Sequence, residues 1–361
     1  MLYYGCELRE EVSLVKKVIV LLLFLTIIFI IWENFSFLFV EDEVLGQIPD
    51  EDLNSNNSIM VYSPLNEKII IPIVKEFQET TGIQVNYLSS GTGNLLKLLE
   101  QKEDMPLMDV MWGGSREFLD LHLDLFQPYK TIHRDKLSPD FRHAEDYWNG
   151  FNILPIVFMY NKKLVDEEDI PKSWEDLLDP KWKGKIAYAD PNNSGSSFMI
   201  LSALLTLNTD GEEYNWENIE KFIDNLEGRI LPKSSDVYNG IANGDFAMGP
   251  TMEEAVVRLI NQGADVGIVY PEEGTVFITD AVALMKDAEN PEAAKIFIDF
   301  VLSKKIQGYM VDNFLLRSIR DDIIFPDGLI PMSEMNIMES DATQIYENKD
   351  TILDIWDSLV N

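Results

Sequence analysis

Cysteine is almost absent from this chain: of its 361 residues, only Cys6 carries a thiol. A disulfide bond within the chain, a thiolate nucleophile in the body of the protein and a cysteine-based metal site are therefore excluded. Cys6 precedes the apolar run of the N-terminus instead of following it, so it cannot serve as the lipid-bearing cysteine of a lipoprotein.

Basic residues are also few, since 29 Lys and Arg stand against 62 Asp and Glu, for a net charge of −33. This balance argues against a nucleic-acid partner, because phosphate backbones attract clustered Lys and Arg. It does not argue for a cationic ligand, because a local group of N–H donors can still hold an anion on an acidic protein. With 46% hydrophobic and 25% charged residues, the chain has the composition of a globular protein long enough for two domains.

Catalytic and cofactor motifs are missing as well. The three histidines, His122, His133 and His143, are 11 and 10 residues apart, and no HExxH pair occurs. The stretch "GGSRE" lacks the second glycine of a GxSxG nucleophile elbow, and neither GxxxxGK[ST] nor GxGxxG is present. We therefore expect no enzyme activity, no resident metal and no cofactor.

A long hydrophobic run is present only at the N-terminus. Lys16 and Lys17 precede an unbroken apolar stretch from Val18 to Trp32, which is the pattern of an export signal. Its length of about 15 residues is close to that of a membrane span, so residues 1–40 are expected to be a signal peptide or an uncleaved membrane anchor. The two lysines favour an N-terminus inside the cell and the bulk of the chain outside. Residues 41–57 are polar and acidic, as in a linker.

From Ser58 onward, predicted strands and helices alternate. The strand "SIMVYSP" is followed by the amphipathic helix "IIIPIVKEFQETT", which Gly82 should end, and then by "IQVNYLSS", "NLLKLLEQKE" and "MDVMWGG". This alternation predicts an α/β fold with a parallel sheet and helices on both faces. Later segments continue the pattern, and the C-terminal part reads as amphipathic helix.

Two turns of small residues, each placed just before a helix, are candidate anion-binding sites. The first small-residue turn lies within "YLSSGTGNLLKLLEQ" and the second within "YADPNNSGSSFMILSALL". The free N–H groups and positive dipole end of a helix start can hold an anion, although such turns also serve simply as helix caps. The candidate residues are Ser90, Gly91 and Thr92 in the first turn and Ser194, Gly195 and Ser196 in the second. Other predicted strand ends carry Ser63, Trp112, Gly113 and the segment "YPEEGT".

Seven motifs taken in order resemble the extracellular solute-binding proteins of ABC transporters, in the branch of ferric-iron, 2-aminoethylphosphonate and sugar-phosphate binders. They are "VYSP", "SSGTGNLLKLLE", "DVMWGG", "LPIVFMYNKKLV", "PKSWEDLLDPKWKGKIAYADPNNSGSS", "SSDVYNGIANGDFAMGPTMEEA" and "VYPEEGT". The resemblance covers most of the chain after residue 58. It implies a two-lobed type II periplasmic-binding-protein fold, each lobe a mixed, mainly parallel sheet flanked by helices. The implied boundaries are 58–154 with 277–335 for lobe 1, 155–276 for lobe 2, and 336–361 for a C-terminal helical segment, with crossings at 153–155 and 276–280.

The resemblance also implies that the two lobes close on one ligand, with one small-residue turn on each. We expect a small phosphorylated or phosphonate anion that is passed to a membrane permease by a monomeric, exported protein. Hydroxyl and N–H donors suit phosphate or phosphonate oxygens, and a nearby carboxylate could pair with an amine or with sugar hydroxyls. The further contributors are Ser63, Trp112, Gly113, Ser235, Tyr238, Thr251, Glu253, Tyr270 and Glu273.

Three alternatives stay open from the sequence. The first keeps the fold and binds Fe(III) through the phenolates of Tyr160, Tyr238 and Tyr270, although the adjacent tyrosine pair of the iron binders is missing. The second is a hydrolase on the same scaffold, for which no base or metal site can be named. The third is a membrane-tethered sensor, if the N-terminal run is retained.

Overall fold

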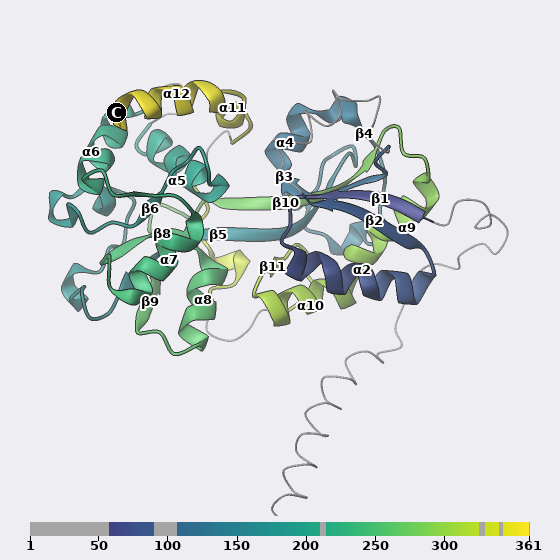
Figure 1. Ribbon diagram of the computed structural model, residues 1–361, viewed down its shortest axis with the longest axis horizontal. Coiled ribbons are helices and arrows are strands. Elements are labelled where there is room, and N and C mark those ends of the chain that lie inside the picture. Colours follow the sequence, from purple (N-terminus) through teal and green to yellow (C-terminus); the bar gives the residue numbers. More distant parts are fainter. Residues whose placement is uncertain (1–57, 90–106, 210–213, 325–328, 339–341, 361) are drawn as a thin grey trace, which may run out of the picture. The chain divides into compact units, whose positions relative to one another are not determined.

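The structure is a computed structural model that describes residues 58–89, 107–209, 214–324, 329–338 and 342–360 (Figure 1). The predicted export segment, the acidic linker, Cys6 and the first small-residue turn lie outside these ranges. In the described part of the chain, no helix is long and apolar enough to cross a bilayer.

The first sheet has the strand order β11-β5-β10-β3-β1-β2. Strands β1 (Ser58–Ser63), β2 (Gln84–Ser89) and β3 (Val110–Ser115) run parallel, as the alternation of strands and helices predicts. Helix α2 (Glu67–Thr81) connects β1 to β2, and Gly82 ends it in the left-handed conformation, as predicted. The short strand β4 (Phe126–Gln127) pairs with β10 (Phe277–Met285).

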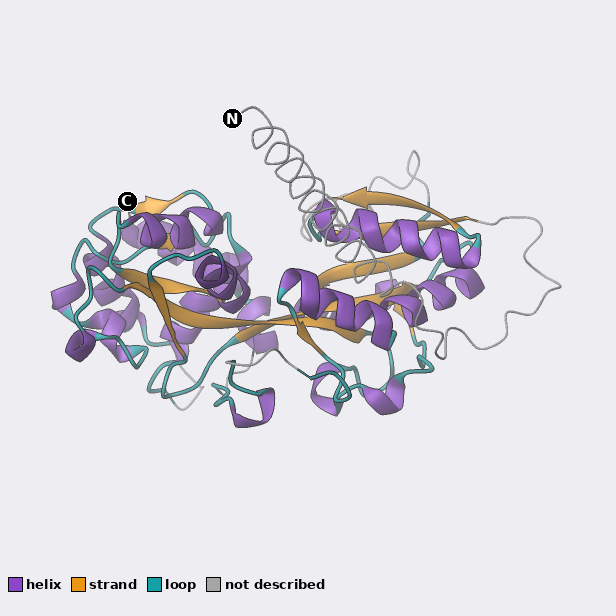
Figure 2. Cartoon of the chain, turned by 90° about the horizontal axis from the view of Figure 1, so that it is seen from below, coloured by secondary structure: helices purple, strands orange, loops and turns teal. Residues whose placement is uncertain are grey.

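One long strand, β5 (Asn149–Asn161), belongs to both sheets. Its residues up to Pro155 pair with β10, and β11 (Arg317–Ser318) joins it on the other edge. From Ile156 onward it pairs instead with β8 (Met248–Met252) and β9 (Val266–Val269), which form the second sheet. Figures 1 and 2 show this strand running from one group of helices to the other. The lobe boundaries remain a prediction, which the change of partners after Pro155 supports.

The pairing corrects one detail of the predicted fold class. The mixed α/β architecture is confirmed, but β5 and β10 pair antiparallel with every neighbour, so the sheets are less parallel than expected. The physical reason is that the chain crosses between the sheets twice in opposite directions, and the two crossing strands lie side by side.

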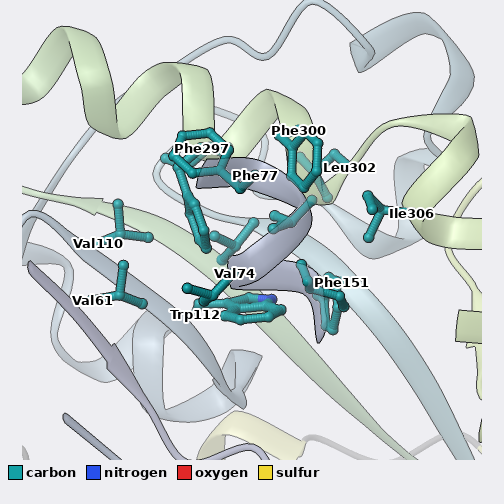
Figure 3. Packing of buried hydrophobic residues seen from close by; sticks show 14 of the residues in the cluster. Val61, Val74, Phe77, Val110, Trp112, Phe151, Phe297, Phe300, Leu302 and Ile306 are labelled. Atoms are coloured by element: carbon teal, nitrogen blue, oxygen red, sulfur yellow. The ribbon is translucent and has the colours of Figure 1, made fainter. Parts of the chain in front are cut away.

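Helices cover both faces of each sheet. On the first sheet, α4 (Arg116–Leu121) packs on one face, and α2, α9 (Pro291–Val301) and α10 (Lys304–Phe314) pack on the other. Figure 3 shows Trp112 of β3 between Phe151 of β5 and the aromatic rings of α2 and α9. On the second sheet, α5 (Gly195–Thr206) and α6 (Trp216–Leu226) cover one face, and α7 (Ser234–Asn243) and α8 (Glu253–Asn261) cover the other.

The C-terminal segment forms α11 (Ala342–Glu347) and α12 (Lys349–Val360), so its predicted helical character is confirmed. Ile345, Ile352 and Trp356 are buried in the same hydrophobic cluster as α5 and α6. Tyr346 packs both against this cluster and against the cluster beneath α4. The segment is thus fixed on the second sheet and contacts the first.

Candidate functional site

Three helices of the second sheet begin at the same edge. Strands β6 (Tyr188–Ala189) and β7 (Ile230–Leu231) are parallel, and Ile186, just before β6, forms a parallel bridge with Met248 of β8. These strands lead into α5, α7 and α8 respectively. Because parallel strands end at the same edge of a sheet, the N-termini of the three helices gather there, which is where open α/β sheets hold ligands.

The second small-residue turn forms the start of α5. Ser194 caps the helix by accepting the Ser197 amide at 3.2 Å, and its hydroxyl lies 3.0 Å from that of Ser196. Both hydroxyls are buried, whereas Gly195 is exposed and a Cβ built on it would meet no atom within 4 Å. The Ser194 hydroxyl therefore caps the helix and contacts the Ser196 hydroxyl, and Gly195, the first residue of the helix, faces open space. The corresponding residues Ser90, Gly91 and Thr92 of the first turn lie outside the described residues.

The α7 start carries Ser235 and Tyr238, which are both half-buried. No side chain caps this helix, because Lys233 occupies the cap position without such a bond. The Arg258 guanidinium lies 5.2 Å from the centre of the Tyr238 ring. The start of α7 therefore has no side-chain cap, although the Asp236 amide donates to the Lys233 carbonyl at 3.0 Å.

Three predicted contributors at the first sheet have structural roles instead. Ser63 is fully buried and donates its hydroxyl to the Trp112 carbonyl at 2.6 Å. The Trp112 ring is also fully buried, with Phe151 and Phe297 each at 5.4 Å in edge-to-face contact. Gly113 has a φ of 104°, and a Cβ there would lie 2.8 Å from Leu65. These contacts hold β1, β3 and the intervening turn together, and a role of the three residues in ligand binding stays a prediction.

Glu253, a residue predicted to contact the ligand, forms a buried ion pair with Arg317. Arg317 donates from Nε to Oε2 and from Nη2 to Oε1, each at 2.6 Å, and both side chains are at most 1% exposed. Tyr270 donates its hydroxyl to the same carboxylate. Burial, together with the Glu253 charge, raises the pKa of Tyr270. Since α8 carries Glu253 and β11 carries Arg317, this pair joins the second sheet to the first.

The two remaining predicted contributors are also engaged in the fold. Glu273 accepts the Trp174 amide at 3.1 Å and the Glu175 amide at 3.4 Å, so its carboxylate caps a turn. Thr251 is buried within β8, where it pairs with Val157 of β5. Thr251 is buried, whereas Glu273 is exposed, and a role of either side chain in ligand binding stays a prediction.

The predicted iron donors do not lie on one face of the second sheet. Tyr160 packs with the cluster of α5 and α6, whereas Tyr238 and Tyr270 pack with the cluster of α7 and α8. The use of these three phenols to bind iron stays a prediction. Among the described residues, no group of three or more His, Cys, Asp or Glu side chains is placed to hold a metal.

Sequence reasoning did not identify a polar group at the carboxyl end of β3. Asp280 of β10 lies opposite both Ser115 of β3 and Asn152 of β5 in the strand register. Burial, with a smaller effect from Glu117, raises the pKa of Asp280 to about 6, although the Asn152 side chain and the Gly114 amide oppose this shift. The only signal in the sequence was the place of Asp280 at the end of a predicted crossing.

The family model described as bacterial extracellular solute-binding protein matches residues 106–322. The chain belongs to this family. The Fe(3+)-binding periplasmic protein of Serratia marcescens is 30% identical over 306 residues, covering 82% of this chain and 89% of that protein. A putative 2-aminoethylphosphonate-binding periplasmic protein of Salmonella typhi is 23% identical, covering 68% of this chain and 73% of the relative.

Solved structures of solute-binding proteins share the fold. The periplasmic binding protein AfuA from Actinobacillus pleuropneumoniae, with fructose-6-phosphate bound, superposes with a TM-score of 0.71 at 21% identity. The match covers 84% of this chain and 98% of that one. The type II periplasmic-binding-protein fold expected from the sequence motifs is thus confirmed for the described residues.

Proposed function

We propose that this solute-binding protein captures a small phosphorylated or phosphonate anion outside the cell and delivers it to an ABC permease. The observation that carries the proposal is the shared edge of α5 and α7, where Gly195 faces open space and α7 has no side-chain cap. Two helix starts at one edge supply N–H donors and a positive dipole field, and Lys233 stands at the cap position of α7. The relatives named for 2-aminoethylphosphonate and the neighbour with a bound sugar phosphate support the same ligand class.

Ferric iron is the second candidate, because the Serratia relative named for Fe(3+) is 30% identical to this chain. The donor arrangement weakens this candidate. Tyr160 packs against a different hydrophobic cluster from Tyr238 and Tyr270, and the Tyr270 hydroxyl is donated to Glu253. The raised pKa of Tyr270 also disfavours the phenolate that ferric iron needs.

The test compares ligands on the purified full chain by thermal shift and by titration calorimetry. Phosphonates or sugar phosphates should raise the melting temperature, because a ligand that binds only the folded state stabilises it. Stabilisation by ferric citrate alone would refute the anion proposal in favour of iron. Turnover of a phosphate ester would contradict the accompanying proposal that the protein is not an enzyme.

One substitution examines the α5 start directly. Gly195→Asp places a carboxylate where the anion should bind, and it also favours the helix dipole, so folding should be preserved. We expect the anion affinity to fall by roughly tenfold or more, equivalent to about 1.4 kcal/mol. The matched control is Gly195→Ala, which adds only a methyl group to open space and should change the affinity little. Equal affinities for the two variants would show that the anion binds elsewhere.

Export, retention of the N-terminal segment and a monomeric state are part of the same proposal. N-terminal sequencing of the mature protein distinguishes a cleaved signal peptide from an anchor within residues 1–40. Sedimentation equilibrium with and without ligand measures the oligomeric state, for which we expect a monomer in both.

A further inference from the structure

The C-terminal helices are firmly attached to the second sheet. Ile352 and Trp356 of α12 are each 1% exposed and share one hydrophobic cluster with α5 and α6. The Trp356 indole packs edge-to-face on Tyr188 of β6, with 5.6 Å between ring centres. Asp357 accepts a hydrogen bond of 2.8 Å from the side chain of Asn192, in the turn that leads into α5. Because these partners all belong to the second sheet and its helices, α11 and α12 should move with it.

The same segment also touches the first sheet, since α11 packs against α4 (Figure 1). Tyr346 of α11 makes this contact, and its ring packs against the hydrophobic cluster beneath α4. Burial raises the pKa of Tyr346, and the side chain of Ser115, the N-cap of α4, opposes this shift by hydrogen bonding to the phenol. On its other side, the ring packs edge-to-face on Phe198 of α5, with 6.3 Å between ring centres.

The attachments to the two sheets differ in strength. Toward the second sheet, the segment buries whole apolar side chains, whereas toward the first sheet Tyr346 offers one hydroxyl and part of a half-buried ring. A single intramolecular hydrogen bond changes an equilibrium constant by about two- to tenfold. A contact of this size can break and form again while the rest of the segment stays folded.

The chain before α11 is fixed at a crossing between the sheets. Thr275, near the start of β10, donates its amide to the Asn336 carbonyl at 2.8 Å, and its carbonyl accepts the Met338 amide at 3.0 Å. The Thr275 hydroxyl donates to the carbonyl of Ile156 in β5 at 2.8 Å. A rotation of one sheet relative to the other about this crossing would therefore keep the segment on the second sheet and separate α11 from α4.

We propose that Tyr346 is a positioning residue of solute binding, which docks on α4 when the two lobes close and leaves α4 when they open. Its contact with α4 then favours the closed state. Since a solute held between the lobes binds the closed state, losing this contact should weaken binding by up to the factor by which it shifts the ligand-free equilibrium. The effect on affinity rests on the proposed function, whereas the effect on the lobes requires no solute.

The experiment measures the distance between the lobes of the full chain by pulsed double electron–electron resonance of two nitroxide labels. Cys6→Ser removes the only native thiol, and Asp124→Cys and Glu220→Cys place the labels on exposed positions of the first and second lobe. Without ligand, the ratio of open to closed molecules should rise about two- to tenfold in Tyr346→Phe, which loses only the hydroxyl. It should rise further in Tyr346→Ala, which also loses the ring.

Tyr129→Phe is the matched control. It removes a hydrogen bond of 2.6 Å between the Tyr129 hydroxyl and Asp299, and both residues belong to the first lobe. This variant should lose stability but keep the wild-type distance distribution, which separates an effect on lobe closure from a general loss of a tyrosine hydroxyl.

Each outcome bears on the inference. The inference is overturned when the folded Tyr346 variants keep the wild-type distance distribution, or when the ligand-free wild type shows only the open distance. Titration calorimetry with 2-aminoethylphosphonate should give a larger dissociation constant for Tyr346→Ala than for the wild type. Failure of the wild type to bind any phosphonate or sugar phosphate would refute the proposed function alone, because the distance measurement uses no ligand.

Discussion

Replacing Arg317 by methionine would leave the Glu253 carboxylate buried without its guanidinium. The two side chains are joined by two hydrogen bonds of 2.6 Å and are at most 1% exposed, so water cannot replace the lost partner. Breaking a buried pair from one side typically costs about 3–5 kcal/mol of the free energy of unfolding. We expect this cost for Arg317→Met and a similar cost for Glu253→Gln.

The double variant provides the decisive measurement. With both charges removed, neither residue leaves an isolated buried ion, so the double variant should be no less stable than the worse single variant. The interaction energy from the double-mutant cycle should therefore be about 3 kcal/mol. Urea denaturation followed by tryptophan fluorescence gives the four free energies of unfolding.

Arg258→Met is the matched control, because Arg258 reaches Glu254 at 3.6 Å across a partly exposed surface. Its effect should be within about 1 kcal/mol. Strictly additive effects of Arg317→Met and Glu253→Gln would refute the reasoning, because they would mean that the two groups do not depend on each other.

Asp280→Asn should stabilise the ligand-free protein at pH 8 but not at pH 4. Burial raises the pKa of Asp280 from the usual 3.8 to about 6, so the folded state keeps this proton at pH values where the unfolded state has lost it. The free energy of unfolding of the wild type therefore falls as pH rises through this window, by at most about 3 kcal/mol. An equal effect of Asp280→Asn at both pH values, measured by urea denaturation, would contradict this. Trp356→Ala should lower the free energy of unfolding by about 3–5 kcal/mol, because the indole is 1% exposed in the core of the second sheet. A loss of stability below about 1 kcal/mol would show that α12 is not part of that core. Gly249→Ala should lower the melting temperature strongly, since a Cβ there would lie 2.3 Å from the Ala187 carbonyl oxygen. In the control Gly308→Ala, the added methyl group meets no atom within 4 Å, and the melting temperature should rise slightly.

Local sequence patterns predicted local structure well. The apolar spacing of Ile70, Ile73, Val74 and Phe77 places one face of α2 in the core, and Gly82 ends the helix. The Ser194 turn begins α5 as predicted. Helix periodicity, caps and positive-φ glycines depend on neighbouring residues only, and a single sequence contains them in full.

The roles of the polar side chains were decided by the tertiary structure. Ser63 bonds to a carbonyl 49 residues away, and Glu253 pairs with an arginine 64 residues away, so nothing in their local sequence distinguishes them from ligand contacts. The group of Glu117, Asp280 and Asn152 exists only because β5, β10 and β3 lie side by side. The sequence alone determined the buried face of α2 and the helix ends at Gly82 and Ser194, because helix periodicity and caps depend on short-range contacts. Only the folded chain decided which charges meet, since strand order and register bring distant residues together.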